Sequence, residues 1–290
     1  MKGGQQKLAS IVPKESRLER LETGFQFTEG PLWNAFEGCL LFSDIPANRI
    51  YKWFPNEGVE VFRDPSGNSN GLTYDRQGRL LICEHGNRRL SRIDKDGTYA
   101  VLADTFRGKR LNSPNDVVVK SDRTVYFTDP PYGIEPHEQE LKFQGVYRFD
   151  IERRELILLV DDFIRPNGLA FSFDETVLYI GDSSIAKRHV RAFDVDPDGT
   201  LSNGHVFAEI LSELPGNPDG MKVDIDGSLY VSAAGGIWVF SEDGEHLGTI
   251  RTPEIPANCA WGGEDWRTLF ITARTSIYRL KTNVAGVKVP

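Results

Sequence analysis

Residues 113–129 read SPNDVVVKSDRTVYFTD, and this stretch contains the unit that is repeated along the whole chain. A polar turn, SPND, leads into the apolar residues VVV, and a second polar turn, KSDR, leads into the apolar run TVYFTD. Two short apolar segments joined by a turn rich in Asp and Ser are typical of a pair of antiparallel strands. The unit therefore predicts β-structure.

The second strand of this unit occurs six times. Its copies are CLLFSD, RLLICE, TVYFTD, VLYIGD, SLYVSA and TLFITA, which end at Asp44, Glu84, Asp129, Asp182, Ala233 and Ala273. The equivalent residues Leu41, Leu81, Tyr126, Tyr179, Tyr230 and Phe270 lie 40, 45, 53, 51 and 40 residues apart. A β-rich repeat of about 40 to 50 residues cannot bury its apolar face alone and is typical of a propeller blade.

One further segment of each repeat alternates apolar and polar residues, as a half-buried strand does, for example GVYRFD, and a fourth strand follows in most repeats, for example ELILLVDD. We therefore predict an all-β fold, a six-bladed β-propeller of four-stranded antiparallel blades around a central channel. Residues Leu18 to Phe27 are predicted to form the outer strand of the last blade, which closes the ring. The predicted domains are a loosely ordered N-terminal tail, 1–16, and a single propeller, 17–290.

Composition excludes several classes of partner. The 290 residues carry a formal net charge of −8 without any Lys/Arg run longer than two, so we expect no nucleic acid to bind. No stretch has the roughly 18 apolar residues of a membrane span, and MKGGQQKLAS lacks a secretory core, so we expect no membrane and a cytoplasmic protein. Three cysteines cannot all pair, and no oligomer is predicted.

The polar turn before each central strand places one oxygen-bearing side chain at an equivalent position in every repeat. These residues are Glu29, Asn70, Asn115, Asn167, Asp219 and Asn258. Any one of them alone fits an ordinary turn, since Asn and Asp tolerate left-handed backbone. Six in register would surround the propeller axis with oxygen atoms, two of them from carboxylates, which are the ligands that a hard divalent cation prefers. Calcium is the predicted ion, with magnesium or manganese as alternatives.

The chain resembles the family of gluconolactonases, regucalcin (senescence marker protein) and luciferin-regenerating enzyme, and is most similar to its bacterial gluconolactonases. The stretches that carry this resemblance are TEGPLW, CEHGNRR, KRLNSPNDVVV, FTDPPYG, RPNGLAFS and NPDGMKVD. The resemblance extends from about Leu18 onward and implies a lactonase with one axial cation. Zn²⁺ is a further alternative to calcium, beside magnesium and manganese. The metal ligands that it implies are Glu29, Asn115, Asn167 and Asp219.

The resemblance implies hydrolysis of a sugar lactone such as gluconolactone, with Asp219 as the catalytic general base. The predicted substrate-binding residues are His85, Arg110, Asn112 and Tyr132. Asn70 and Asn258 are expected to form hydrogen bonds in the channel or to serve their own turns. Two alternatives stay open: an esterase or phosphotriesterase-like hydrolase on the same cation, and a non-catalytic calcium-binding propeller. No G-x-S-x-G, P-loop or dinucleotide-binding pattern is present.

Overall fold

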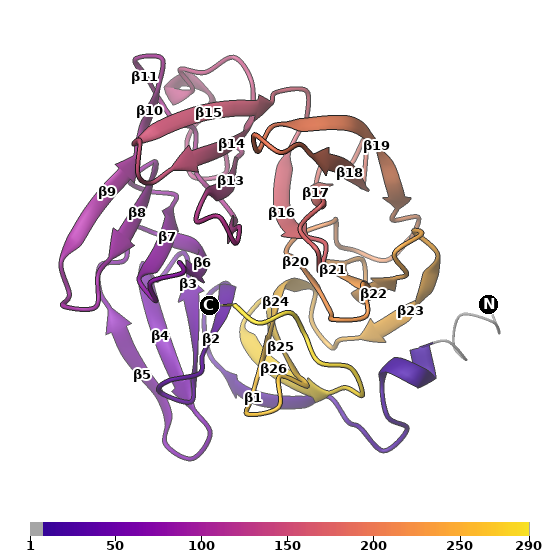
Figure 1. The fold of residues 1–290 in the computed structure, drawn as a ribbon. Coiled ribbons are helices and arrows are strands. Elements are labelled where there is room, and N and C mark those ends of the chain that lie inside the picture. The colour runs from indigo at the N-terminus through magenta and orange to yellow at the C-terminus, as the bar shows by residue number, and fades with distance from the viewer. Residues whose placement is uncertain (1–7, 290) are drawn as a thin grey trace.

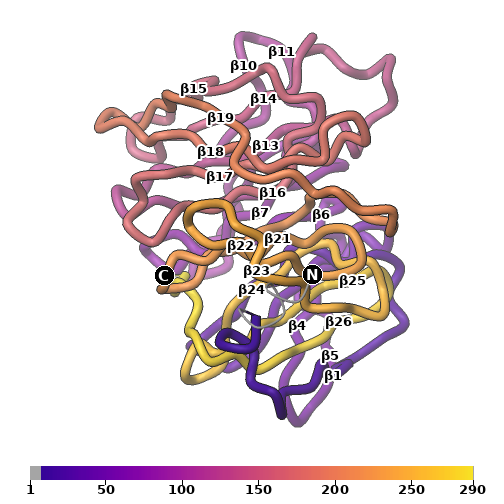
Figure 2. The backbone as a smooth tube through the Cα atoms, turned by 90° about the vertical axis from the view of Figure 1, so that its right-hand side faces the viewer, coloured from indigo at the N-terminus to yellow at the C-terminus, as the bar shows by residue number. Residues whose placement is uncertain are grey.

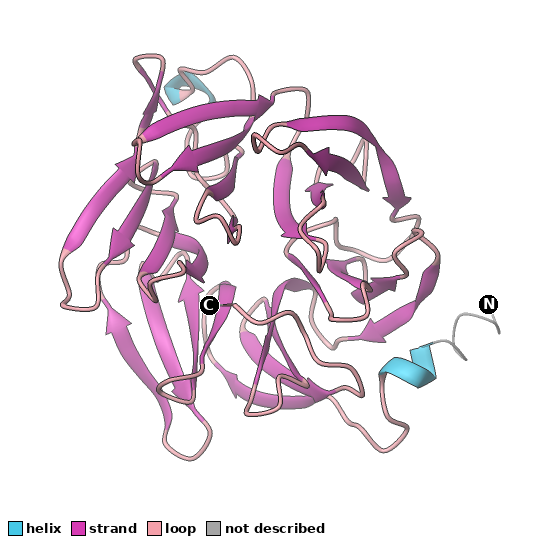
Figure 3. Cartoon of the chain, in the orientation of Figure 1, coloured by secondary structure: helices cyan, strands magenta, loops and turns pink. Residues whose placement is uncertain are grey.

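The computed structural model describes residues 8–289. In this range, six four-stranded antiparallel sheets surround a central axis like the blades of a propeller (Figure 1, Figure 3). The predicted fold class is confirmed, including the number of blades and the number of strands in each. In the first five blades the chain enters at the axis and leaves at the rim, so these blades repeat the same path.

The first three blades follow one another directly in sequence. Blade one contains β2 (Thr28–Asn34), β3 (Cys39–Asp44), β4 (Arg49–Phe54) and β5 (Gly58–Arg63). Blade two contains β6 (Ser69–Tyr74), β7 (Leu80–Glu84), β8 (Arg89–Ile93) and β9 (Tyr99–Ala103). A small hairpin, β10 (Thr105–Phe106) and β11 (Lys109–Arg110), precedes the third blade. Blade three contains β12 (Val117–Val119), β13 (Val125–Asp129), β14 (Gly145–Asp150) and β15 (Glu155–Val160), with a 3₁₀ turn at Pro136–Glu138 between β13 and β14.

The remaining blades have the same order of strands. Blade four contains β16 (Pro166–Phe171), β17 (Val177–Asp182), β18 (His189–Val195) and β19 (Leu201–Glu209). Blade five contains β20 (Met221–Val223), β21 (Leu229–Ala233), β22 (Gly236–Phe240) and β23 (His246–Arg251). Blade six contains β24 (Pro256–Gly262), β25 (Thr268–Ala273) and β26 (Ser276–Lys281), and its fourth strand is β1 (Glu19–Thr23).

Blade six joins the two ends of the chain, as the sequence predicts. Strand β1 pairs antiparallel with β26, with Glu19 opposite Arg279, and the guanidinium of Arg279 donates a hydrogen bond of 2.7 Å to the Glu19 carboxylate. Side chains also pack between the first and last blades, where the rings of Trp33 and Phe270 stack with centroids 5.1 Å apart. Because β1 supplies the fourth strand of blade six, the ring is closed by strand pairing and by packing between the first and last blades.

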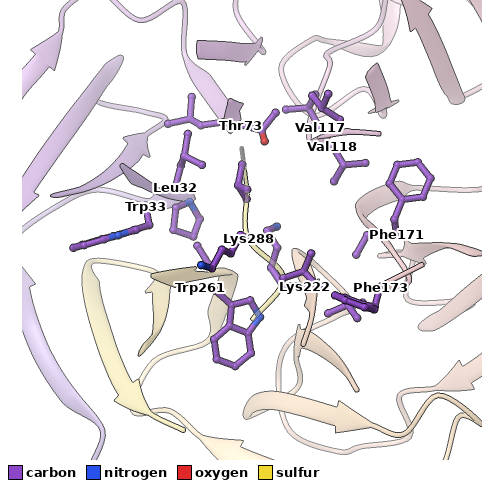
Figure 4. A pocket seen from close by; sticks show the side chains of 18 of the residues that line it. Leu32, Trp33, Thr73, Val117, Val118, Phe171, Phe173, Lys222, Trp261 and Lys288 are labelled. Carbon is purple, nitrogen blue, oxygen red and sulfur yellow. The ribbon is translucent and has the colours of Figure 1, made fainter. Parts of the chain in front are cut away.

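The C-terminal residues cross one face of the propeller (yellow in Figures 1 and 2). The backbone N–H of Val287 donates to the carbonyl of Val223, and that of Gly286 donates to Trp266. A small cavity of about 120 Å³ lies beside this segment, and Lys222, Lys288 and the inner strands line it (Figure 4). The C-terminal residues thus cover the end of the channel toward which the inner strands run.

Residues 8–16, which the sequence assigns to a loosely ordered tail, contact blade six; residues 1–7 lie outside the described part of the chain. Ile11 is buried in the same apolar cluster as Trp266 and Leu280, and its carbonyl accepts a hydrogen bond from the backbone of Asn283. Residues 8–16 therefore differ from the loose attachment predicted for 1–16, because Ile11 packs into the apolar cluster of blade six. Among the described residues, no helix has the length and apolar character needed to cross a membrane.

Candidate active site in the axial channel

Each axial residue lies at the beginning of an inner strand. Glu29, Asn70, Asn167 and Asn258 belong to the inner strands themselves, and Asn115 and Asp219 lie two residues before the first residues of β12 and β20. The pairing register shifts beside the axial residue in four blades, for example between Glu29 and Leu32 of β2. Such bulges turn a side chain away from the regular alternation of a strand, and here they occur where the strand meets the axis.

The glycine after an axial residue allows neighbouring inner strands to approach each other closely. A Cβ atom on Gly168 would lie 2.2 Å from the carbonyl oxygen of Asp219, and one on Gly30 would lie 2.0 Å from that of Asn70. No side chain fits at these distances. The Asn-Gly and Asp-Gly pairs therefore serve the packing of inner strands around the axis, in addition to the turn chemistry that the sequence suggests.

Five of the six axial residues, all except Asn258, line a cavity of about 520 Å³ at the face of the propeller opposite the C-terminal segment. Six of the predicted site residues line it: Glu29, Asn115, Asn167, Asp219, His85 and Tyr132. The other lining residues are Phe27, Ile45, Pro46, Asn70, Ser183, Pro215, Gly216, Asn217, Ile255, Pro256, Ala257 and Arg274. The structure therefore brings all four candidate metal ligands to one cavity, from blades one, three, four and five.

Two carboxyl groups meet in this cavity. Burial and the nearby charge of Asp116 raise the pKa of Glu29 to about 7. Burial and repulsion from Glu29 and Asp116 raise the pKa of Asp219 well above its ordinary value. Like charges brought together away from water disfavour ionisation. A cation bound between the two carboxylates would offset their repulsion and favour their ionised forms.

Several oxygen atoms of the cavity have no hydrogen-bond partner among residues 8–289. They are Oδ1 of Asp219, Oδ1 of Asn70 and Oδ1 of Asn217, each shielded from solvent. Unpartnered buried oxygens are costly for a folded protein, and they are the donor type that calcium and magnesium bind. The residues present therefore fit a hard divalent cation. No group of three or more His, Cys, Asp or Glu side chains in the described chain is arranged to hold a metal, so a four-ligand set here depends on the Asn amide oxygens.

Two residues orient the Asn ligand candidates. His85 Nε2 lies 3.4 Å from Nδ2 of Asn115 and 3.3 Å from Nδ2 of Asn70, and burial lowers the pKa of the imidazole to about 4. A neutral imidazole can accept a hydrogen bond from an amide. Nδ2 of Asn167 likewise donates to the hydroxyl of Ser183 at 2.9 Å. In both cases the amide nitrogen is engaged, which leaves the amide oxygen for a ligand.

Carboxylates at the ends of central strands hold the turns that lead to the axial residues. Both oxygens of Asp129 accept hydrogen bonds, from the backbone N–H of Asn112 at 2.8 Å and of Ser113 at 2.7 Å. Equivalent pairs join Asp44 to Gln26 and Phe27, and Asp182 to Ile164 and Arg165. This contact explains why three copies of the central strand end in Asp, and it fixes the backbone just before the ligand candidates.

Two predicted substrate-binding residues do not line the cavity. The Asn112 side chain is fully buried and donates hydrogen bonds to the carbonyls of Asp129 and Phe143, at 2.9 and 3.0 Å. Arg110 is exposed on β11, and its guanidinium donates to the carbonyl of Asn87. Although both residues are close to Asn115 in sequence, neither reaches the cavity. Asn112 is hydrogen-bonded to the 133–144 loop, and Arg110 belongs to an exposed hairpin.

Sequence reasoning also missed lining residues that the repeat could have revealed. Ser183 and Arg274 directly follow the central strand of their blades, the position that His85 occupies in blade two. Alignment of that position across the repeats, like alignment of the axial position, would have found them. Asp116 was missed as well; it is buried beside Asn115, and Nδ2 of Asn258 donates to it at 3.5 Å. That contact and the one from Asn70 to His85 confirm hydrogen bonding of Asn70 and Asn258 inside the channel.

The fold and the cavity define a six-bladed β-propeller with an acidic, oxygen-lined axial site. The chain belongs to the SMP-30/gluconolactonase/LRE-like family, whose model matches residues 27–275. The family resemblance seen in the sequence is thereby confirmed.

Individual relatives agree with this assignment. The chain is 36% identical to a gluconolactonase of Zymomonas mobilis over 97% of its own length and 85% of that protein. It is 26% identical to the pentonolactonase XacC of Haloferax volcanii, over 87% of this chain and 83% of that protein. The structure of XC5397 from Xanthomonas campestris, described as a gluconolactonase, superposes with a TM-score of 0.88 at 36% identity, covering 95% of this chain and 92% of that one.

Proposed function

We propose that this protein is an enzyme that hydrolyses sugar lactones of the gluconolactone type with the help of one divalent cation. The observation that carries the proposal is the pair Glu29 and Asp219, two buried carboxyl groups with raised pKa values on the wall of an open cavity. Similarity to a gluconolactonase and a pentonolactonase supports a lactone as the substrate class.

Glu29, Asn115, Asn167 and Asp219 would hold the cation. Two carboxylates neutralise a divalent charge, and the amide oxygens of the two Asn residues complete a set of oxygen ligands. A cation held there would polarise the ester carbonyl of the lactone and stabilise the negative charge that develops on its oxygen. Calcium suits this oxygen-only set best; Mg²⁺, Mn²⁺ and Zn²⁺ are the other ions that we would test.

Asp219 would also accept a proton from the attacking water. Without a cation, burial and the charges of Glu29 and Asp116 raise the pKa of Asp219. A bound cation would lower the basicity of this carboxylate, so the proton would be accepted by an oxygen that does not ligate the ion. The unpartnered Oδ1 atom of Asp219 is available to accept the hydrogen bond from that water. His85 is less suited to this role, because its pKa of about 4 makes it a weak base.

His85 and Tyr132 would contact the substrate from the wall of the cavity. Their rings lie 6.5 Å apart between centroids, and both line the same side of the cavity as Asn115. A planar ring edge and a phenol hydroxyl suit the alternating CH and OH groups of a sugar. A substrate bound in this way would lie between these rings and the carboxylates.

The test is proton release from glucono-1,5-lactone. Activity should fall to the spontaneous rate after chelation and return with added Ca²⁺ or another divalent ion. Glu29→Gln and Asp219→Asn should each abolish it, whereas Glu57→Gln, in the exposed turn between β4 and β5, should leave it unchanged. Wild-type activity in Glu29→Gln or Asp219→Asn would reject the assignment.

The same preparation separates the alternatives. Turnover of aryl esters or phosphotriesters in place of lactones would favour a different hydrolase on the same cation. Binding of calcium without turnover of any of these compounds would indicate a non-catalytic propeller.

A further inference from the structure

Two arginine–aromatic pairs flank the mouth of the axial cavity. The guanidinium carbon of Arg274, which follows the last β25 residue, lies 5.5 Å from the ring centroid of Phe27. The guanidinium carbon of Arg165, just before β16, lies 5.4 Å from the ring centroid of Tyr132. Phe27 and Tyr132 both line the cavity. One pair belongs to the junction of blades six and one, the other to blades three and four.

Neither guanidinium is paired with a carboxylate in the part of the chain that the structure describes. Other arginines of the blades do form ion pairs; Arg279 pairs with Glu19, and Arg49 pairs with Asp64. No carboxylate in residues 8–289 forms an ion pair with Arg274 or Arg165. Arg274 and Arg165 are both exposed, so two guanidinium groups that form no ion pair within residues 8–289 lie beside one cavity and are accessible to an anionic ligand.

The backbone holds Arg274 in place before any ligand arrives. Its φ angle is 47°, and its carbonyl accepts hydrogen bonds from Thr28, from the backbone N–H at 2.7 Å and from the hydroxyl at 3.2 Å. Thr28 directly precedes Glu29, so the arginine and the ligand candidate are tied to the same short segment. Arg274 is also the one Lys or Arg among the cavity's lining residues.

We propose that Arg274, with Arg165 on the opposite side, recognises an anionic group on the substrate. A guanidinium is planar, stays charged and binds carboxylate or phosphate through two parallel hydrogen bonds. Stacking on an aromatic ring leaves its N–H edge available for such a group. The preferred substrates are then sugar lactones that bear a carboxylate or phosphate distant from the ring ester. This inference rests on the proposed lactone hydrolysis and specifies its substrate class.

The test compares three lactones: neutral glucono-1,5-lactone, glucaro-1,4-lactone with a free carboxylate, and 6-phosphoglucono-1,5-lactone. The wild-type protein should have a higher kcat/KM for at least one anionic lactone than for the neutral one, and the comparison of the two identifies the anion. Arg274→Gln should lower kcat/KM for that anionic lactone by about tenfold or more, the size of one lost charge-assisted hydrogen bond. The loss should be mainly in KM, and hydrolysis of the neutral lactone should change less than about twofold.

Matched variants separate the site from general charge effects. Arg165→Gln should produce a smaller loss of the same kind, and Arg274→Lys should restore part of it. Arg153→Gln, which removes the same charge from the turn after β14, should have no effect on the preference. An equal effect of Arg274→Gln on neutral and anionic lactones, or a wild-type preference for the neutral lactone, would overturn the inference while leaving the proposed function intact. Absence of turnover with all three lactones would instead count against the proposed function.

Discussion

The carboxyl groups of Glu29 and Asp219 come from blades one and five and face each other in the axial cavity, where the charge of Glu29 raises the pKa of Asp219. Burial raises the pKa of Glu29 to about 7, and Asp219 is shifted well upward. Two such groups held together resist ionisation, so near neutral pH the cation-free site retains protons that exposed carboxyl groups would have lost.

Without a bound cation, the stability of the protein should fall as pH rises from about 4.5 to above 7. The ordinary pKa of a Glu is 4.5 and that of folded Glu29 is about 7, so in this range the unfolded chain has lost a proton that the folded protein retains. A difference of one in pKa between the folded and unfolded states changes the free energy of unfolding by about 1.4 kcal/mol. The measurement is Tm against pH in the presence of a chelator, for the wild type and Glu29→Gln. The Gln variant should lose less stability across this range, and parallel curves would contradict the prediction.

A divalent cation should raise the Tm at pH 7.5. A ligand that binds only the folded state at 100 times its Kd contributes about 2.7 kcal/mol to the free energy of unfolding. Titration of the chelated protein with Ca²⁺ and Mg²⁺, followed by thermal unfolding, checks this. Asp219→Asn should abolish the shift, because it removes one of the two carboxylates, whereas Glu57→Gln should retain it. A calcium-dependent shift of wild-type size in Asp219→Asn would place the ion elsewhere.

Replacement of His85 by Phe should weaken cation binding and lactone hydrolysis by about tenfold, because Nδ2 of Asn115 loses its acceptor and the amide becomes free to rotate. The wild-type activity profile between pH 5.5 and 8 should show no titration of this histidine, since its pKa is about 4. His85→Gln, which keeps a hydrogen-bonding group at this position, should recover part of the binding. Unchanged calcium affinity in His85→Phe would show that His85 does not orient the ligand.

Gly168→Ala should destabilise the fold by more than about 2 kcal/mol, because the new Cβ would lie 2.2 Å from the carbonyl oxygen of Asp219. Gly97→Ala is the comparison: no atom lies within 4 Å of its Cβ, and only a positive φ of 85° opposes the change, which costs about 1 kcal/mol. Chemical denaturation of the two variants measures the difference. Equal losses would mean that close approach of the inner strands is not what requires Gly168.

The periodic apolar runs were sufficient to predict the blades, their number and the closure through Leu18 to Phe27. These features depend on local alternation and on repeat length, which are visible in a linear sequence. The axial position could be read from the sequence for the same reason, since Glu29, Asn115 and Asp219 recur in register, and these three residues line one cavity. Arg110 and Asn112 were placed in the cavity only by their proximity to Asn115, and a distance of three to five residues along a turning chain does not determine which way a side chain faces.

The sequence by itself determined the repeat, and with it the fold and the ring of oxygen-bearing residues at the axis, because each blade encodes its strands and its axial residue locally. Only the tertiary structure decided which residues meet there. His85 and Ser183 orient the Asn amides, and Asp116 adds its charge to the pair Glu29 and Asp219. Arg274 lies over Phe27 at the mouth of the cavity, without an ion pair among residues 8–289. These contacts join different blades or distant parts of one blade. Burial and like-charge repulsion depend on which residues lie close together in space, and residues of different blades come together only when the ring has closed.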